Sequence, residues 1–344
     1  MKRKLILYGG GALLLLLFSI VVSLSLGAGA VALPDVWRIL LHHVPGLGGF
    51  VTPDWAPAEE VIVWKVRFSR VVLAILVGAS LALAGAGFQG VLRNPLADPY
   101  TLGVASGASV GAAFLILFGL QMAIGAFTVP AVAFLTGILT LAVVYRLASR
   151  EGKAQTETLI LAGVVVQSFL GAFVSFMVSL SEKVINEIVY WLMGSLSMRG
   201  WDYSLILTPY LLVGAVVLIG YGRSLNLFAL GERQASHMGV HVERTKLIVL
   251  SVSTLLTAAA VSVSGVIGFV GLVVPHLVRL VVGPDYRLIL PISVLTGGIY
   301  VLWADTIARL ALSPKEIPLG VVTALIGAPF FAYLLNKRKK VGRG

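Results

Sequence analysis

The 344-residue sequence contains no cysteine and few charged residues. The missing cysteines exclude a disulfide framework and any thiolate-ligated metal site. Asp, Glu, Lys and Arg make up only 12% of the chain, well below the quarter or so of an average soluble protein. Hydrophobic residues make up 58%, and the mean hydropathy is +0.98. This composition predicts an integral membrane protein with one domain over residues 1–344.

Long apolar runs occupy most of the chain. A helix needs about 20 residues to cross ~30 Å of hydrocarbon, and barrel strands would alternate polar and apolar residues instead. The sequence therefore predicts an all-α polytopic membrane protein with about ten transmembrane helices. The predicted spans are roughly 5–30, 61–92, 101–120, 122–147, 157–181, 203–222, 246–266, 270–282, 288–311 and 318–336.

The first span has two interpretations. Basic residues at positions 2–4 precede an apolar run that ends in GAGA, which is also typical of a cleaved signal peptide. The run from Leu5 to Leu26 is longer than the 7–15 or so residues of a signal core, so a retained helix is preferred. With ten crossings and an inner N-terminus, 18 of the 26 Lys and Arg residues fall in inner segments, as the positive-inside rule requires. We therefore expect both termini on the cytoplasmic side, and the net charge of +11 indicates contact with anionic lipid rather than nucleic acid.

Ionisable residues are missing from most of the predicted membrane interior. Ion-coupled carriers usually keep such groups there to carry the coupling ion, so ion coupling is disfavoured and an ion-coupled secondary transporter is kept as the alternative. The sequence also lacks a GxxxxGK[ST] phosphate loop and the clustered Asp, His or Ser motifs of a membrane enzyme. A pump built on this chain would need energy from another subunit. The ranges without Asp, Glu, Lys or Arg are 71–92, 101–145, 158–181, 203–222, 247–275 and 318–335.

A stretch rich in proline and glycine, RNPLADPYTLGVASGASVGAA at 93–113, follows the second span and includes the start of the third. Asn94 and Pro95 are expected in an inner turn, and Thr101 is expected to cap the next helix. Small residues every four positions allow helix backbones to approach closely, and they would also suit an element beside a pore. In this helix they are Gly103, Gly107 and Gly111, and in the preceding span Ala74, Gly78, Ala82, Ala86 and Gly90.

A second polar segment, about 224–244, interrupts two spans on the predicted inner side. Its pattern predicts two short helices, which end at Gly231 and Gly239. These two helices cannot bury their apolar faces alone. The segment could lie on the bilayer surface, but a groove on another protein is preferred because helix-in-groove binding uses this anchor spacing. The apolar positions are Leu225, Phe228, Ala229, Ala235 and Met238.

Several long motifs, in order along the chain, resemble the FecCD-type permeases of type II ABC importers, which include vitamin B12, haem and iron-siderophore permeases. The resemblance covers nearly the whole sequence and implies a ten-helix subunit that pairs with a second copy of itself. It also implies two cytoplasmic ABC ATPase subunits, a solute-binding protein outside, and the cytoplasmic membrane of a bacterium or archaeon. No cofactor is expected on this chain, since ATP and Mg would be used by the partner ATPase. The motifs are RNPLADPYTLGVASGASVGA, LILAG, YWLMGSL, LNLFALGERQASHMGV, SGVIGFVGLVVPHLVR, LWADTIAR and EIPLGVVTALIGAPFF.

The resemblance assigns roles to three groups of residues. It implies that the segment around Glu232 forms coupling helices in a groove of the ATPase, and that three arginines receive acidic residues of the binding protein. It also implies that the fifth and tenth helices line the pathway, with a cytoplasmic gate in which Glu157 stands where a small hydroxyl residue is commoner. The coupling residues are Leu225, Ala229, Leu230, Gly231, Glu232, Ala235, Met238 and Gly239; the docking residues are Arg67, Arg70 and Arg309; the gate residues are Gln155, Thr156, Glu157 and Thr158.

Two groups of residues have simpler interpretations. The three arginines could instead snorkel at the membrane interface, or in the case of Arg309 pair with Asp305 four residues earlier. His276, alone at the inner end of a span, is expected to be structural. His42 and His43 are adjacent on irregular backbone, which seldom lets two side chains share one metal. No metal site is predicted.

Overall fold

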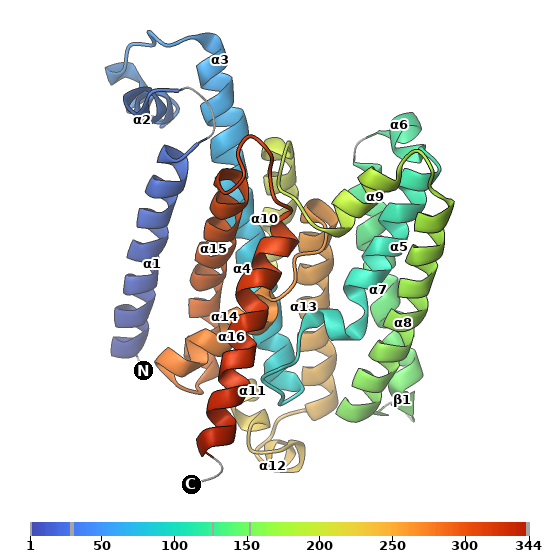
Figure 1. The fold of residues 1–344 in the computed structure, drawn as a ribbon. Helices are drawn as coiled ribbons and strands as arrows, with labels where there is room; N and C mark the ends of the chain where they lie inside the picture. The colour runs from blue at the N-terminus through green and yellow to red at the C-terminus, as the bar shows by residue number, and fades with distance from the viewer. Residues whose placement is uncertain (1, 28–30, 126, 151–152, 342–344) are drawn as a thin grey trace.

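The computed structural model describes residues 2–27, 31–125, 127–150 and 153–341, and it is almost entirely helical (Figure 1). Each of the ten predicted spans overlaps one helix of 13 to 25 residues. These helices are α1 (Lys2–Ser25), α4 (Ser69–Val91), α5 (Val104–Leu117), α7 (Thr128–Ala148), α8 (Thr156–Leu180), α10 (Gly200–Gly220), α13 (Val242–Ser264), α14 (Val270–Val282), α15 (Tyr286–Leu310) and α16 (Leu319–Val341).

The all-α polytopic class is confirmed, while the number of crossings and the dimer stay predictions. Among the described residues, seven helices are long and apolar enough to span a membrane, and three further apolar helices are shorter. The shorter ones are α5, α14 and the first part of α16, Leu319–Tyr333. At 1.5 Å per residue, the 14 residues of α5 extend only about 21 Å, less than the ~30 Å of a bilayer core.

Short elements connect the long helices. A two-stranded antiparallel hairpin, β1 (Ser149–Arg150) and β2 (Lys153–Ala154), precedes α8. A short helix α3 (Pro57–Glu60) and a π-helical stretch η2 (Val61–Phe68) lead without a break into α4. The others are α2 (Leu33–His42), η1 (Gly48–Phe50), η3 (Pro99–Leu102), α6 (Leu120–Ile124), α9 (Ile185–Leu192), α11 (Gly222–Phe228) and α12 (Glu232–His237).

Helix α4 runs through the centre of the bundle and packs against α10, α13, α14 and α15. Its small residues account for that position, because a side chain at Gly78 would overlap the backbone of Gly297, and one at Gly85 would overlap Gly271. Close backbone approach of this kind holds membrane helices together where no hydrophobic drive acts between them.

The two ends of the bundle carry different short helices. Helix α1 begins, and α16 ends, at the end where α11 and α12 lie, whereas α2, α3 and α6 lie at the opposite end (Figure 1). We call these the inner and the outer end. An even number of crossings, as the sequence predicts, places both termini at one end.

The start of α5 differs from the prediction. Thr101 does not cap the helix; it lies inside η3, where its hydroxyl donates to the carbonyl of Asp98 at 2.7 Å. Helix α5 begins only at Val104, after Gly103, whose φ of 76° lies in the left-handed region that suits glycine. A sharp turn therefore replaces the predicted first helical turn, because Asp98 accepts from the backbone N–H of Tyr100 and stabilises η3 instead.

Candidate functional site

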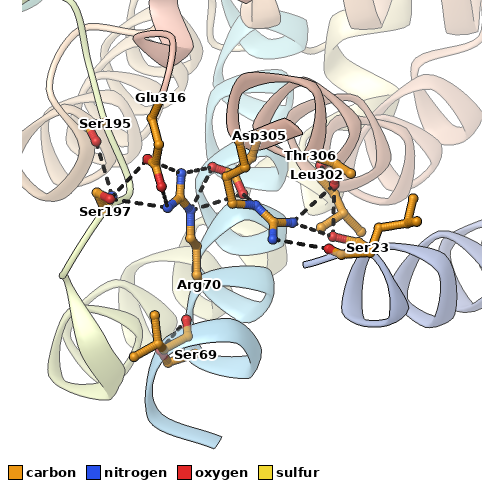
Figure 2. A network of polar contacts seen from close by, with 12 residues as sticks. Ser23, Ser69, Arg70, Ser195, Ser197, Leu302, Asp305, Thr306 and Glu316 are labelled. Atoms are coloured by element: carbon orange, nitrogen blue, oxygen red, sulfur yellow. Dashed lines mark hydrogen bonds and ion pairs between the residues drawn. The ribbon is translucent and has the colours of Figure 1, made fainter. Parts of the chain in front are cut away.

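At the outer end, a buried carboxylate lies between two arginines from different helices (Figure 2). Asp305 of α15 is fully buried and contacts Nε of Arg70 from α4 at 2.9 Å. Its other oxygen accepts from Nε of Arg309, one turn later on α15, at 3.1 Å. Both arginines are only 9% exposed. A buried charge without a partner would be very costly, so each of these groups depends on the others.

Arg70 has a second carboxylate partner. Its Nη1 and Nη2 atoms donate to the two oxygens of Glu316 at 2.9 and 3.0 Å, a two-point geometry that suits guanidinium. Ser197 donates to Glu316 at 3.0 Å and accepts from Arg70 at 3.2 Å. Glu316 lies in the connection between α15 and α16, and Ser197 in the connection between α9 and α10. Arg70 therefore joins α4, α15 and two loops of the outer end.

The environment of Glu316 changes its acidity. Partial burial opposes its ionisation, but the hydrogen bonds and positive charge of Arg70, helped by Ser197, outweigh burial and hold the pKa of this carboxyl below its usual range. Glu316 therefore stays ionised well into acid solution. We refer to Arg70, Asp305, Arg309 and Glu316 together as the outer cluster.

The outer cluster also holds the peripheral helix α1. Arg309 donates to the hydroxyl of Ser23 at 3.0 Å, and Ser23 lies 2.8 Å from the hydroxyl of Thr306. One turn nearer the inner end, the indole of Trp303 donates to Ser19 at 2.9 Å. Polar contacts of this sort are a main source of association between helices in hydrocarbon, so the outer half of α1 is fixed to α15.

The three arginines predicted to dock a binding protein lie at the outer end, and their docking role stays a prediction. Arg70 and Arg309 contact carboxylates of this chain, and the alternative pairing of Arg309 with Asp305 is present. Arg67, at the end of η2, is 7% exposed and packs against Gly27, where any added side chain would overlap the guanidinium. Sequence reasoning missed Glu316, because nothing in its spacing indicates proximity to Arg70, 246 positions earlier.

At the inner end, the expectation that two short helices cannot bury their apolar faces within the chain is wrong for three residues. Leu225 and Phe228 of α11 and Ala235 of α12 are 0% exposed. Leu225 packs on α4, where a side chain at Gly90 would lie 3.1 Å from its methyl groups. The predicted coupling residues Leu225 and Ala235 are therefore covered by the chain itself.

Two other predicted coupling residues are exposed. Leu230 is 57% and Met238 59% exposed, and Ala229 and Gly239 are also on the surface. Gly231 has a φ of 109°, which reverses the chain between α11 and α12. A carboxylate oxygen of Glu232 accepts a hydrogen bond of 2.7 Å from the ammonium of Lys246, a buried residue of α13. The inner end therefore exposes three apolar residues, Ala229, Leu230 and Met238, on a segment fixed to the bundle.

The predicted gate lies where α8 begins, directly after the hairpin of β1 and β2. Gln155 is extended and precedes the first helical residue, Thr156. Gln155, Glu157 and Thr158 are exposed in the single chain, and Thr156 is half-buried. The same helix continues with exposed Leu161, Val165 and Phe169. The gate assignment stays a prediction.

The glycines of α5 lie against α7. A side chain at Gly107 would overlap Thr136 and Thr140 of α7, and one at Gly111 would overlap Thr136. This face therefore meets a neighbouring helix of the same chain. In the preceding turn, the Asn94 side chain accepts from the backbone N–H of Leu96 at 2.9 Å across Pro95.

The histidines are placed among aromatic rings. His43 stacks on Trp64 at a centroid distance of 4.1 Å and lies 3.3 Å from Glu60. His276 is 5% exposed, with its ring 5.8 Å from that of Phe331. Within the described residues, no group of three His, Cys, Asp or Glu side chains could hold a metal ion.

These features define a polytopic all-α membrane protein with an ion-paired outer end and two short surface helices at its inner end. Comparison with known families gives the particular class. Residues 15–337 match the FecCD transport family, and the chain belongs to that family. It is a family of ABC transporter permease subunits, which carry no ATPase domain of their own.

Individual relatives are also named as permease proteins. The chain is 45% identical over 327 residues to the uncharacterized ABC transporter permease protein YvrB of Bacillus subtilis, with 94% of this chain and 92% of YvrB covered. It is 49% identical over 290 residues to the cobalamin import system permease protein BtuC of Halobacterium salinarum, covering 84% and 76%. A solved structure described as an inward-facing metal-chelate type ABC transporter has a TM-score of 0.82 and 33% identity, covering 98% of this chain and all of that one.

Proposed function

We propose that the chain is the transmembrane permease subunit of an ATP-driven importer that moves a metal chelate into the cytoplasm. Cobalamin, haem and iron-siderophores are the candidate substrates. Support comes from the 49% identity to a permease named for cobalamin import and from the likeness to a transporter of metal-chelate type. The ion-coupled alternative gains no support, because the buried carboxylate of Asp305 is already bound by two arginines.

The proposed complex contains two copies of the chain, two ATPase subunits and one binding protein. The exposed apolar faces of α8 and α16, with Phe169 and Leu325 each more than 60% exposed, are suited to contact between copies. ATP and Mg would be used by the ATPase, and this chain would bind no cofactor. The gate at Gln155, Thr156, Glu157 and Thr158 would then lie at the inner end of the pathway.

The surface at Ala229, Leu230 and Met238 carries the proposed coupling. Apolar side chains exposed on a fixed polar segment outside the bilayer are typical of a protein contact. Because Glu232 and Lys246 fix this segment to α13, force applied by an ATPase would pass directly into the bundle. Closure of the ATPases on ATP would move the helices through this contact.

A paired substitution tests the coupling. Leu230→Asp with Met238→Asp should release the ATPase during purification, or should abolish uptake while ATP hydrolysis continues. The matched control makes the same changes at the outer end, Leu312→Asp with Met198→Asp, where the side chains are 63% and 89% exposed. The control should keep its ATPase. Unchanged uptake and an intact complex in the inner-end variant would refute the coupling assignment.

A further inference from the structure

An apolar groove of about 580 Å³ separates the inner half of α1 from α14 and α15. Leu7, Gly11 and Leu15 line it from α1, Val281 from α14, and Ile292 and Ile299 from α15. The polar contacts of α1 with Trp303, Thr306 and Arg309 lie farther toward the outer end. Helix α1 is therefore fixed by polar contacts at its outer half, while its inner half packs on the bundle through Leu5 and Tyr8 and borders the groove with Leu7 and Gly11.

The groove adjoins a basic opening at the inner end. A second cavity, of about 540 Å³, is lined by Lys4, Asn226, Asp285 and Arg287, and Val282 lines both cavities. Lys4 precedes Leu7 by three residues on α1, so the two side chains are neighbours on one face of that helix. A long molecule with an apolar tail and a polar head would suit two adjoining cavities of this kind.

The charge at the opening is positive. Among the residues that line it, Lys4 and Arg287 outnumber the single acid Asp285, which leaves a net charge of +1, and Lys2 and Arg3 precede Lys4 on α1. Within the described part of the chain, no carboxylate lies within ion-pair distance of the three basic residues of α1.

Asp285 binds Nε and Nη2 of Arg287, with a shortest distance of 2.6 Å, and orients the guanidinium. Among the described residues no hydrogen bond occupies Nη1 of Arg287, so the donors of this atom can meet an anionic ligand.

No close contact within the described residues explains three consecutive glycines of α1. A side chain added at Gly9, Gly10 or Gly11 would meet no atom of the described residues within 4 Å. Each glycine in a helix interior costs about 0.5–1 kcal/mol relative to alanine. Close packing explains the glycines of α4, but here the space beside the helix is open. Gly11 lines the groove, so a ligand lying there would take the place of the absent neighbour.

We propose that this groove binds an anionic phospholipid of the inner leaflet, with one acyl chain between α1, α14 and α15 and its phosphate at Lys4 and Arg287. An acyl chain is the apolar ligand that a bilayer supplies at this depth. Basic pockets between transmembrane helices at the membrane surface bind anionic headgroups. A second copy of the chain would satisfy the apolar walls but would leave the basic opening without a counter-charge. The lipid completes the inner half of the contact between α1 and α15.

Lipid titration of the detergent-purified chain tests the proposal. Phosphatidylglycerol should raise the unfolding temperature, and phosphatidylcholine with the same acyl chains should do so at least tenfold less effectively. Lys4→Gln with Arg287→Gln should remove this preference, whereas Lys4→Arg should keep it. The matched control, Arg38→Gln with Lys315→Gln at the outer end, should also keep it. Glycerol phosphate and inorganic phosphate should not protect, because they lack the acyl chain.

A second variant tests the groove itself. Gly11→Phe should fill it and weaken retention of phosphatidylglycerol at least tenfold in native mass spectrometry, without changing the number of chains per particle. Equal effects of both lipids on the native chain, or a preference that survives loss of both basic residues, would overturn the proposal. A Gly11→Phe variant that changes the oligomeric state and leaves lipid retention intact would assign the groove to a contact between copies. If Gly11→Phe does not fold, the lipid titration of the Lys4 and Arg287 variants tests the proposal by itself.

Discussion

Arg70 and Glu316 are 246 positions apart in the sequence, yet two hydrogen bonds of 2.9 and 3.0 Å join them at the outer end of the bundle. Arg70 is 9% exposed, while the Glu316 side chain is 30% exposed. A carboxylate arriving from outside could therefore reach Arg70 only by replacing Glu316. If a binding protein docks on these arginines, Glu316 competes with it.

Glu316→Gln should therefore strengthen docking of the cognate binding protein. The amide keeps the size of the side chain but removes the competing charge, so we expect roughly tenfold tighter binding at low salt and a steeper loss of affinity as salt is added. Surface plasmon resonance on the reconstituted permease measures both. Glu182→Gln, in the loop after α8, removes one carboxylate elsewhere and serves as the control. Equal affinities in all three proteins would show that Arg70 does not receive the partner's acidic groups.

Arg70→Met should destabilise the fold strongly. It leaves the buried carboxylate of Asp305 with one arginine instead of two, and loss of one partner of a buried pair costs about 3–5 kcal/mol. Thermal unfolding in detergent measures the loss. Arg38→Met, at an exposed ion pair with Asp54, should cost no more than about 1 kcal/mol. Similar unfolding temperatures for the two variants would contradict the strong coupling inferred for the outer cluster.

Charge reversal at Arg70 or Arg309 would therefore be a poor test of docking. A glutamate at either position would face Asp305 across a buried contact, and unfolding would hide any effect on the partner.

Stability should fall in acid because of Glu316. Its pKa is lower in the folded chain than in the unfolded chain, so the unfolded state takes up its proton first as the pH falls. The contribution of the ion pair is fully present above the ordinary pKa of glutamate, near 4.5, and is lost as the pH falls through the lowered folded value. Glu316→Gln should flatten this part of the stability curve, measured by thermal unfolding between about pH 3 and pH 6. A variant curve parallel to that of the native chain would contradict the assignment.

Gly107→Leu should disrupt the packing of α5 on α7. The new side chain would overlap Thr136 and Thr140, and overpacking of this kind costs about 1–3 kcal/mol or more. Gly171→Leu on α8 is the matched control, because a side chain there would meet no atom of the described residues within 4 Å. Thermal unfolding of the two variants makes the comparison, and equal stability would show that α5 and α7 are not in close contact.

The helical spans were predictable because hydrophobicity is a property of a local window. All ten predicted stretches overlap a helix, although α7 begins six residues late and α5 three residues late. The difference at α5 arose because Asp98 and Gly103 build a turn that helix-capping rules alone did not anticipate. The small residues of α4 were recognised as packing positions, but their partners, such as Gly297 for Gly78, were not.

The candidate sites were less predictable. The sequence indicated two short helices around Glu232, and the structure contains them as α11 and α12. It did not indicate which apolar residues face inward, so Leu225 and Ala235 were grouped with the exposed Leu230 and Met238. On helices of six or seven residues, one or two apolar positions define no unique face, and the fit against α4 decides which residues are covered.

The sequence by itself determined that this protein is a bundle of membrane helices of the FecCD family, because apolar length and ordered motifs are encoded along the chain. Only the tertiary structure decided the state of its charged residues. Arg70 meets Asp305 across 235 positions and Glu316 across 246, and Lys4 and Arg287 line one cavity from opposite parts of the chain. A charge in a membrane protein is stabilised by whichever opposite charge or headgroup the fold places beside it, and that neighbour is set by the packing of helices rather than by local sequence.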